Sequence, residues 1–293
     1  MSPRKSEALA RIESLVCRDV GRGTEKLIEA TRGELAAAAE ILAQAGSIGL
    51  ITGFFVPRGD VQAPETDGPV GVALLAAALA ACGKKVRVAV DGPCACAVRA
   101  AVKAAGAVDV DEVTDIAATT GAWKGAGVDC AISIERAGRS IDGKPRNMRG
   151  VDVSPWTLPL DDLFTGGAWR RLAVGDGGNE IGMGKLSREL IAAEVPNGAA
   201  IASVTSCDHL VVAGVSNWGA YGLMAALAVV RPEWRDIIAR FLTAERDLAV
   251  TQAVVDVGGV DGVTAKREQT VDGYGADVHG PLVEELRRIA SAA

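Results

Sequence analysis

The chain has 293 residues, a formal net charge of −6 and a hydrophobic fraction of 49%. This length accommodates one large α/β domain or two small ones, with a sizeable core. The negative charge and the lack of a basic run with interleaved aromatics exclude a typical nucleic-acid-binding protein, so we expect a small-molecule partner. Aromatic residues make up only 4%, which favours closely packed helices on a parallel sheet.

The amino terminus and the cysteines indicate a cytoplasmic protein. No apolar segment of a signal peptide follows Met1, and no uncharged apolar run reaches the ~18 residues that a membrane span needs. The six cysteines are scattered, and Cys94 and Cys96 lack the spacing of a zinc or redox pair. We therefore expect buried, reduced thiols and no membrane partner, and we leave a homo-oligomer open.

The first predicted elements are two helices. Residues 6–16 and 24–45 carry apolar side chains at helical spacing, with Thr24 as a candidate N-cap and Gly46 as a candidate stop. We expect them to form an N-terminal helical extension, residues 1–45, packed on a main α/β domain of residues 46–293.

From residue 47 onward, short apolar runs alternate with alanine-rich helical segments. This alternation predicts a doubly wound, mainly parallel, Rossmann-like sheet between two layers of helices. The predicted strands are residues 47–52, 85–90, 108–113, 128–134, 171–175 and 199–205. The main predicted helices are residues 70–81, 94–105, 185–193, 217–229, 233–257 and 282–290.

Residues 175–184 contain five glycines and follow a predicted strand. Glycines let the backbone approach a ligand, and the helix that follows would point its free N–H groups into the same space. A phosphate loop would need Gly at 179 and Ser or Thr at 186, and a dinucleotide loop would need Gly at 187. The chain has Asn179, Leu186 and Ser187, so no nucleotide cofactor is expected.

The side chains of this loop are acidic. Asp176, Asn179 and Glu180 suit a cation, an ammonium group or acid and base chemistry better than a phosphate. Asp176 and Glu180 could hold a divalent metal, since oxygen ligands suit Mg²⁺ or Mn²⁺. The alternative is a tight glycine turn with a solvated acidic face.

Other polar residues follow other predicted strands. Glu135 and Arg136 end the fourth strand, and a turn at residues 142–143 would return Asn147 and Arg149 toward Glu135. Such a group could clamp a substrate carboxylate while the acid acts as a base, or it could form a surface salt-bridge network.

Three further segments remain open between a structural and a functional role. Residues 66–68 precede a helix and could cap it or line a site at the carboxyl edge of the sheet. Asp208 and His209 follow the predicted sixth strand, where they could act as acid and base or be structural. His279 could be a cap or a site residue, and its spacing does not decide between these roles.

Four stretches, residues 66–69, 135–150, 175–184 and 207–219, together resemble the C-terminal domain of the D-glutamate cyclases. The resemblance extends from about residue 45 to the end of the sequence. These enzymes close D-glutamate to 5-oxo-D-proline with loss of water. In eukaryotic members a larger hydro-lyase-like domain precedes this one, and we expect a stand-alone copy here.

The resemblance implies a lyase that acts on D-glutamate or a related amino acid. The alternatives are a non-catalytic module that binds small carboxylates and a metal-dependent lactam hydrolase. The expected catalytic residues are Glu135, Asp176, Glu180, Asp208 and His209. The expected substrate-binding residues are Thr66, Asp67, Gly68, Arg136, Asn147, Arg149, Gly177, Gly178, Asn179 and Asn217.

Overall fold

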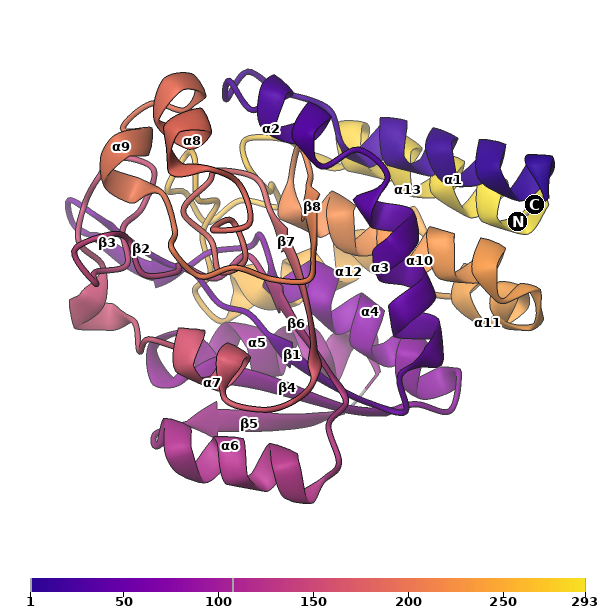
Figure 1. Cartoon of the computed structure of the whole chain (residues 1–293), viewed down its shortest axis with the longest axis horizontal. Coiled ribbons are helices and arrows are strands. Elements are labelled where there is room, and N and C mark those ends of the chain that lie inside the picture. Colours follow the sequence, from indigo (N-terminus) through magenta and orange to yellow (C-terminus); the bar gives the residue numbers. More distant parts are fainter. Residues whose placement is uncertain (1, 107, 293) are drawn as a thin grey trace.

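A computed structural model describes residues 2–106 and 108–292. Within these residues the central sheet is fully parallel, with the strand order β5-β4-β1-β6-β7-β8 (Figure 1). The first strand lies in the middle and the chain winds outward to both sides, as in a doubly wound Rossmann-like fold. The strands are β1 (Ser47–Ile51), β4 (Lys85–Asp91), β5 (Asp109–Val113), β6 (Cys130–Ile134), β7 (Arg170–Gly175) and β8 (His209–Val212).

Side chains along each strand alternate between two buried faces. On β1, Ile48 and Leu50 join one hydrophobic cluster, whereas Ile51 joins the other. The second face is lined by small residues, so its helices pack close to the sheet. A Cβ on Gly49 would lie 2.3 Å from the ring of Trp123. The alanines that contribute to this face are Ala89, Ala131 and Ala173.

The larger cluster is covered by the longer helices. Two of them, α4 and α10, are apolar on every side because other helices cover them as well. The helices of this layer are α1 (Pro3–Val16), α3 (Glu34–Gln44), α4 (Pro69–Ala81), α5 (Gly92–Ala105), α10 (Ser216–Val230), α11 (Arg235–Ala239), α12 (Ala244–Asp256) and α13 (Ala276–Ala292).

Shorter helices cover the second face. They contribute Leu27, Trp123, Phe164, Ile191 and Ile201 to the smaller cluster. These helices are α2 (Glu25–Ala30), α6 (Ile116–Gly125), α7 (Asp161–Thr165), α8 (Arg188–Glu194) and α9 (Gly198–Ile201), and two 3₁₀ turns lie at Ser154–Trp156 and Pro232–Trp234.

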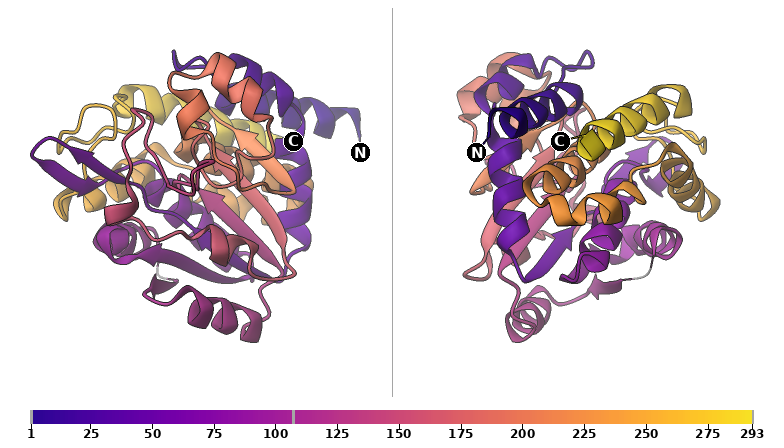
Figure 2. Two further views of the ribbon diagram at one scale, coloured as in Figure 1. Left: turned by 60° about the vertical axis from the view of Figure 1, so that its left-hand side comes forward. Right: turned by 90° about the vertical axis from the view of Figure 1, so that its right-hand side faces the viewer.

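Helices α1 and α3, both before residue 46, share the main core. Leu9, Ile12 and Leu35 belong to the same cluster as α4 and α10. The predicted long helix of residues 24–45 is two helices, because Gly33 takes a left-handed conformation with φ of 89°. Helix α1 (indigo) runs alongside α13 (yellow) in Figures 1 and 2.

The predicted sixth strand is wrong. Residues 198–201 are helical, and the following segment pairs only through isolated bridges of Ser206 with Gly182 and Met183. The sixth strand is instead β8, His209–Val212, which pairs with β7. Asp208 therefore precedes this strand and His209 is its first residue, so neither follows the carboxyl end of a strand.

Two other predicted boundaries differ. The segment 233–257 is broken at residues 240–243 into α11 and α12. Helix α13 begins at Ala276, before the expected start at 282, and contains Pro281.

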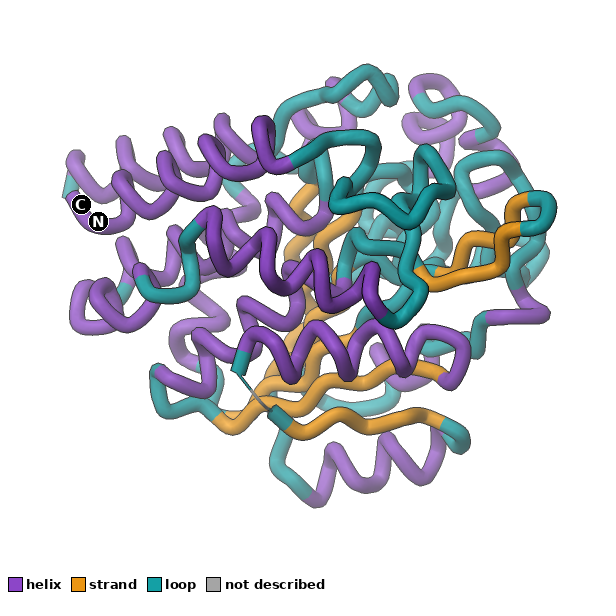
Figure 3. Tube along the Cα trace, turned by 180° about the vertical axis from the view of Figure 1, so that it is seen from behind, coloured by secondary structure: helices purple, strands orange, loops and turns teal. Residues whose placement is uncertain are grey.

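Residues between β1 and α4 form a separate hairpin, β2 (Phe55–Arg58) and β3 (Val61–Pro64), which lies apart from the main sheet (Figure 3). Phe55 stacks on Trp156 at a centroid distance of 6.0 Å, so the hairpin packs against the segment that follows β6. The hairpin thereby forms one wall beside the carboxyl ends of β1 and β6.

All six cysteines are free thiols. Cys94, Cys130 and Cys207 are buried as predicted, but Cys96 is exposed and two others are partly exposed. Among residues 2–106 and 108–292, no helix has both the length and the apolar character needed to span a bilayer.

Candidate active site

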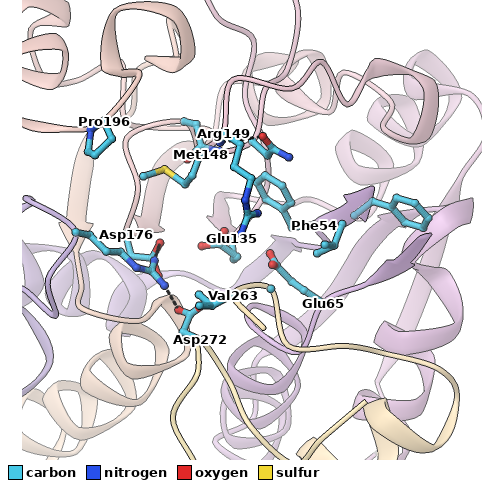
Figure 4. A pocket seen from close by; sticks show the side chains of 15 residues that line it. Phe54, Glu65, Glu135, Met148, Arg149, Asp176, Pro196, Val263 and Asp272 are labelled. Carbon is cyan, nitrogen blue, oxygen red and sulfur yellow. Dashed lines mark hydrogen bonds and ion pairs between the residues drawn. The ribbon is translucent and has the colours of Figure 1, made fainter. Parts of the chain in front are cut away.

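A cavity of about 280 Å³ lies beside the carboxyl ends of β1, β6 and β7. The strand order reverses between β1 and β6, and open α/β sheets bind ligands at such a reversal. Glu65, Glu135, Asp176 and Asp272 point into the cavity, and Arg149 reaches toward them from the opposite side (Figure 4). The cavity is therefore acidic on one side and has a cation on the other.

Three carboxylates form the centre of the acidic side. One ligand atom each of Asp67, Glu135 and Asp176 lies within 4.8 Å of the other two, and all three residues are buried. Asp67 precedes α4, Glu135 follows β6 and Asp176 follows β7. Parallel strands place these loops at one edge of the sheet, as the sequence predicts for this subset of residues.

Asp67 lies between the amino ends of α4 and α10. Its Oδ2 accepts a hydrogen bond from the N–H of Ser216 at 3.0 Å, and its Oδ1 accepts one from the N–H of Asn217 at 2.8 Å. In return, Oδ1 of Asn217 accepts from the N–H groups of Gly68 and Gly71 at 2.9 and 2.8 Å. Each helix thus supplies the cap of the other, and the carboxylate faces the positive end of α10.

Glu135 has a strained backbone. Its φ is +46°, a conformation that residues other than glycine rarely adopt. Gly68 lies directly against it, since a Cβ there would be 2.8 Å from the Cβ of Glu135. Oε2 of Glu135 accepts a hydrogen bond from Oγ of Ser216 at 2.6 Å. The side chain is therefore held in one position.

The glycine-rich loop is held from within by Glu180. Oε1 of Glu180 accepts from the N–H groups of Asp176 and Gly177 at 2.8 and 2.6 Å. Oε2 of Glu180 and Oδ2 of Asp176 are buried and accept no hydrogen bond from the described residues. We expected the next helix, α8, to point its first N–H groups into the cavity. Instead none of its residues lines the cavity, and Ser187 caps its first turn.

Burial raises the pKa of four of these carboxyl groups well above their ordinary values. This holds for Glu65, Asp67, Glu135 and Asp176. Neighbouring acids add to the effect, since Asp176 raises the pKa of Glu135 further, whereas Arg22 opposes the shift at Asp176. Groups of this kind hold their protons to higher pH than ordinary carboxyl groups, and a bound cation would offset the mutual repulsion of their charged forms.

Arg22 is a site residue that sequence reasoning missed. Its guanidinium pairs with Asp176 through Nη1 and with Oδ2 of Asp272 through Nη2, the latter at 2.6 Å. It lies in the loop between α1 and α2, where Oδ1 of Asp19 accepts from the N–H groups of Arg22 and Thr24. The sequence contains only a weak indication that Arg22 belongs to the site, because Arg22 lies between two glycines and far in sequence from the other site residues.

Glu65 and Asp272 were also absent from the expected site. Oε1 of Glu65 is buried and accepts no hydrogen bond from the described residues. Asp272 and Gly273 both have positive φ, and the bridge between Val271 and Tyr274 closes this turn. The sequence feature that could have identified Asp272 was an Asp-Gly pair in a glycine-rich segment, which is typical of a tight turn.

Other expected substrate-binding residues have different positions. Asn147, Arg149 and Asn179 line the cavity. Thr66, Gly68 and Asn217 lie behind the acidic side and hold its backbone. Gly177 and Gly178 pack against Met148 and Ile191, with which a Cβ would clash.

Arg136 does not reach the cavity. Its fully buried guanidinium pairs with Asp91 at 2.5 Å and donates to the carbonyl oxygens of Gly53 and Leu158. These contacts join the ends of β1, β4 and β6. The expectation that Arg136 binds substrate is therefore corrected, because both of its Nη groups donate to acceptors within the fold and the side chain does not line the cavity.

Asp208 and His209 are also outside the site. They lie at the amino end of β8, whereas the cavity lies at the carboxyl ends of the strands. Asp208 pairs with Arg170 at 3.2 Å and accepts from the N–H of Arg171, and Nδ1 of His209 lies 2.8 Å from Oε2 of Glu34. The expected catalytic roles followed from the misplaced sixth strand, and the structure does not bring these two residues to the cavity.

The acidic group has the donor chemistry for a divalent cation. Carboxylate oxygens suit Mg²⁺ or Mn²⁺, and the three that converge are those of Asp67, Glu135 and Asp176. Glu180, expected as a metal ligand with Asp176, uses one oxygen on backbone N–H groups and keeps Oε2 without a partner in the described chain.

The fold and the cavity define an α/β protein with a carboxylate-lined site at the reversal point of a parallel sheet. Residues 12–287 match the sequence family described as "D-glutamate cyclase-like, C-terminal", so the chain belongs to this family. It is 34% identical over 250 residues to the human mitochondrial D-glutamate cyclase. The match covers 77% of this chain and 39% of the human protein, so the chain spans less than half of that relative.

Proposed function

We propose that the chain is a lyase that closes D-glutamate, or a closely related amino acid, to 5-oxo-D-proline with loss of water. The observation that carries this proposal is the polarity of the cavity, with buried carboxylates on one side and the Arg149 guanidinium on the other. An amino acid has a matching polarity, a cationic amine and an anionic carboxylate. The family and its human relative name the reaction class.

The acidic side suits the amine. Glu135 and Asp176 would attract the protonated amine, and their raised pKa values favour uptake of a proton from it. Ser216 holds Glu135 by a hydrogen bond of 2.6 Å, which keeps the carboxylate in place while the proton moves. We assign the role of general base to Glu135.

Arg149 suits the α-carboxylate. Its side chain forms no ion pair with a carboxylate in residues 2–106 or 108–292, and it faces the cavity. A guanidinium presents two parallel donors to a carboxylate, and this arrangement fixes the orientation of the ligand. Bringing the amine close to the γ-carbon supplies part of the rate enhancement through positioning.

Ring closure forms a C–N bond and breaks a C–O bond of the γ-carboxylate. Two protons leave the ammonium group and end on the departing oxygen, which becomes water. The carboxyl groups of Glu135 and Asp176 can pass these protons, because a raised pKa makes each carboxylate a stronger proton acceptor than an ordinary one. A divalent cation held by Asp67, Glu135 and Asp176 would supply Lewis acid chemistry at the carboxylate.

The test is an assay of both glutamate enantiomers with Mg²⁺, with Mn²⁺ and with a chelator, followed by chromatography of 5-oxoproline. We expect turnover of D-glutamate without ATP. Asp176→Asn should lower kcat/KM at least about a hundredfold, because the amide can neither take a proton nor offer a charge. Asp208→Asn is the matched control and should keep activity, since Asp208 lies outside the cavity.

Two results would contradict the proposal. Binding of glutamate in calorimetry without turnover of either enantiomer under any metal condition would indicate a binding module. Loss of turnover in Asp208→Asn together with retention in Asp176→Asn would place the chemistry elsewhere in the molecule.

A further inference from the structure

His279 lies in helix α13, and its imidazole reaches the turn of residues 271–274 that carries Asp272. The imidazole is buried in an aromatic group with Trp218 and Tyr274, whose ring centroids lie 5.8 and 6.5 Å from it. It is one of only two histidines in the chain. The sequence left its role undecided.

The hydrogen bonds of His279 define its tautomer. Nε1 of Trp218 lies 2.8 Å from Nδ1 of His279, and an indole N–H can only donate. Nδ1 therefore accepts and carries no proton, so the proton of the neutral ring is on Nε2. Nε2 lies 3.3 and 3.2 Å from the carbonyl oxygens of Val271 and Tyr274, both of which can only accept.

These two carbonyl groups are the ends of the turn that presents Asp272. Val271 and Tyr274 also exchange backbone hydrogen bonds of 2.9 and 3.0 Å across it. Asp272 lies between them with φ of 57°, the left-handed conformation that a tight Asp-Gly turn of this kind requires. One imidazole N–H shared by both ends holds the turn from the interior, and the N–H of Gly273 donates to Oδ2 of Asp261 at 2.7 Å.

Asp272 in turn positions the cation of the site. Its Oδ2 binds Nη2 of Arg22, and Nη1 of the same guanidinium binds Asp176. A displaced turn would move Arg22, and with it the countercharge of Asp176. A connected series of contacts thus runs from Trp218 through His279 and Asp272 to Arg22.

We propose that His279 is a positioning residue, which in its Nε2–H tautomer holds the 271–274 turn and thereby aligns Arg22 with Asp176. Trp218 selects this tautomer by donating to Nδ1. The kinetic consequence rests on the proposed function, whereas the tautomer and the order of the turn do not.

The first experiment is ¹⁵N NMR of the imidazole nitrogens in the full chain. With two histidines, a His209→Gln variant assigns both rings. We expect His279 to show a protonated Nε2 and an unprotonated Nδ1, and we expect the Nδ1 signal to shift in Trp218→Phe, which lacks the donor. A protonated Nδ1 in the neutral ring overturns the proposal.

The second experiment compares His279→Gln with His279→Phe. Glutamine places an amide N–H near the position of Nε2, whereas phenylalanine keeps the ring volume without any donor. We expect hydrogen exchange at the amides of Val271 and Tyr274 to quicken about tenfold or more in His279→Phe and much less in His279→Gln. Equal exchange in Phe and wild type shows that the ring only fills space and overturns the proposal.

The kinetic arm uses the same pair of variants with D-glutamate. We expect kcat to fall about tenfold or more in His279→Phe, with partial rescue in His279→Gln, because small displacements of catalytic groups are costly. A kcat of His279→Phe equal to that of the wild type would contradict the claim that His279 aligns Arg22 with Asp176. If the wild-type protein has no turnover, the proposed function fails, and the NMR and exchange results still decide the role of His279.

Discussion

Glu135 stores strain where the chemistry is proposed. A non-glycine residue with φ of +46° costs on the order of 1–3 kcal/mol, and such a conformation persists only where the surrounding structure imposes it. Here β6 fixes the preceding residues, Gly68 leaves room for the Cβ, and Ser216 binds the carboxylate. The position of this carboxylate is therefore set before any ligand arrives.

We expect Glu180 to stabilise the folded protein through its hydrogen bonds to the glycine-rich loop. Its Oε1 is the acceptor for two buried N–H groups. Glu180→Ala would leave both without a partner and should lower the free energy of unfolding by about 2–5 kcal/mol, measured by urea denaturation. Glu180→Gln keeps the acceptor and is the matched control, expected to remain near wild type. Equal losses in the two variants would show that charge, rather than the acceptor, holds the loop.

At the scale of elements, the loop between α1 and α2 carries Arg22 across to the site. The loop is fixed at several points, since Oδ1 of Asp19 caps it and the N–H of Gly214 donates to the carbonyl oxygen of Val16 at 2.9 Å. The loop contributes to the site through the guanidinium group of Arg22, whose two Nη atoms pair with Asp176 and Asp272 at the same time.

Arg22→Gln should therefore destabilise the protein by about 3 kcal/mol, because it leaves two buried carboxylates without their countercharge. Arg22→Lys should recover only part of this loss, since an ammonium is a point charge. The measurement is again urea denaturation. Arg11→Gln is the control from the same end of the chain, because its ion pair with Glu285 is largely exposed and should matter little. A stability of Arg22→Gln equal to wild type would contradict the bridging role.

The elements also show where sequence reasoning stops. Residues 199–205 and 209–212 are both short apolar runs, and local pattern does not separate a strand from an irregular segment. Pairing with β7 selects the second run, and pairing is a non-local property. That single displacement moved Asp208 and His209 from the carboxyl edge to the amino edge. By contrast, Asp67, Glu135 and Asp176 could be predicted, because each follows or precedes a correctly placed element.

Whole-molecule stability should depend on pH through the buried acids. Raised pKa values mean that the native state binds protons more tightly than the unfolded chain, so stability falls as pH rises above the ordinary values of 3.8 for Asp and 4.5 for Glu. We expect the thermal midpoint to rise when pH is lowered from about 8 to about 6. Asp176→Asn should flatten this dependence and Asp208→Asn should not. A midpoint that falls with decreasing pH would contradict the assignment.

The whole fold was more accessible to sequence analysis than the whole site. Alternation of apolar strands and alanine-rich helices predicts the doubly wound sheet, and five of the six predicted strands are present. Predicting the site also required Arg22 and Asp272, which lie in irregular loops where the sequence has no helical or strand periodicity to indicate their positions. Arg136 shows the opposite error, since its charge and its place after β6 suggested a ligand, whereas Asp91 neutralises it inside the fold.

The distance in sequence between Arg22 and Asp272 has a consequence for synthesis. Arg22 lies far before Asp272 in the chain, so their ion pair cannot form until the segment that carries Asp272 has left the ribosome. Until then Arg22, the countercharge of Asp176, lacks its second ion pair, the one with Asp272. Contacts of such long range form late in folding. Completion of the cavity therefore waits for the segment that carries Asp272, and a chain made only as far as β8 has the strands of the sheet without the assembled site.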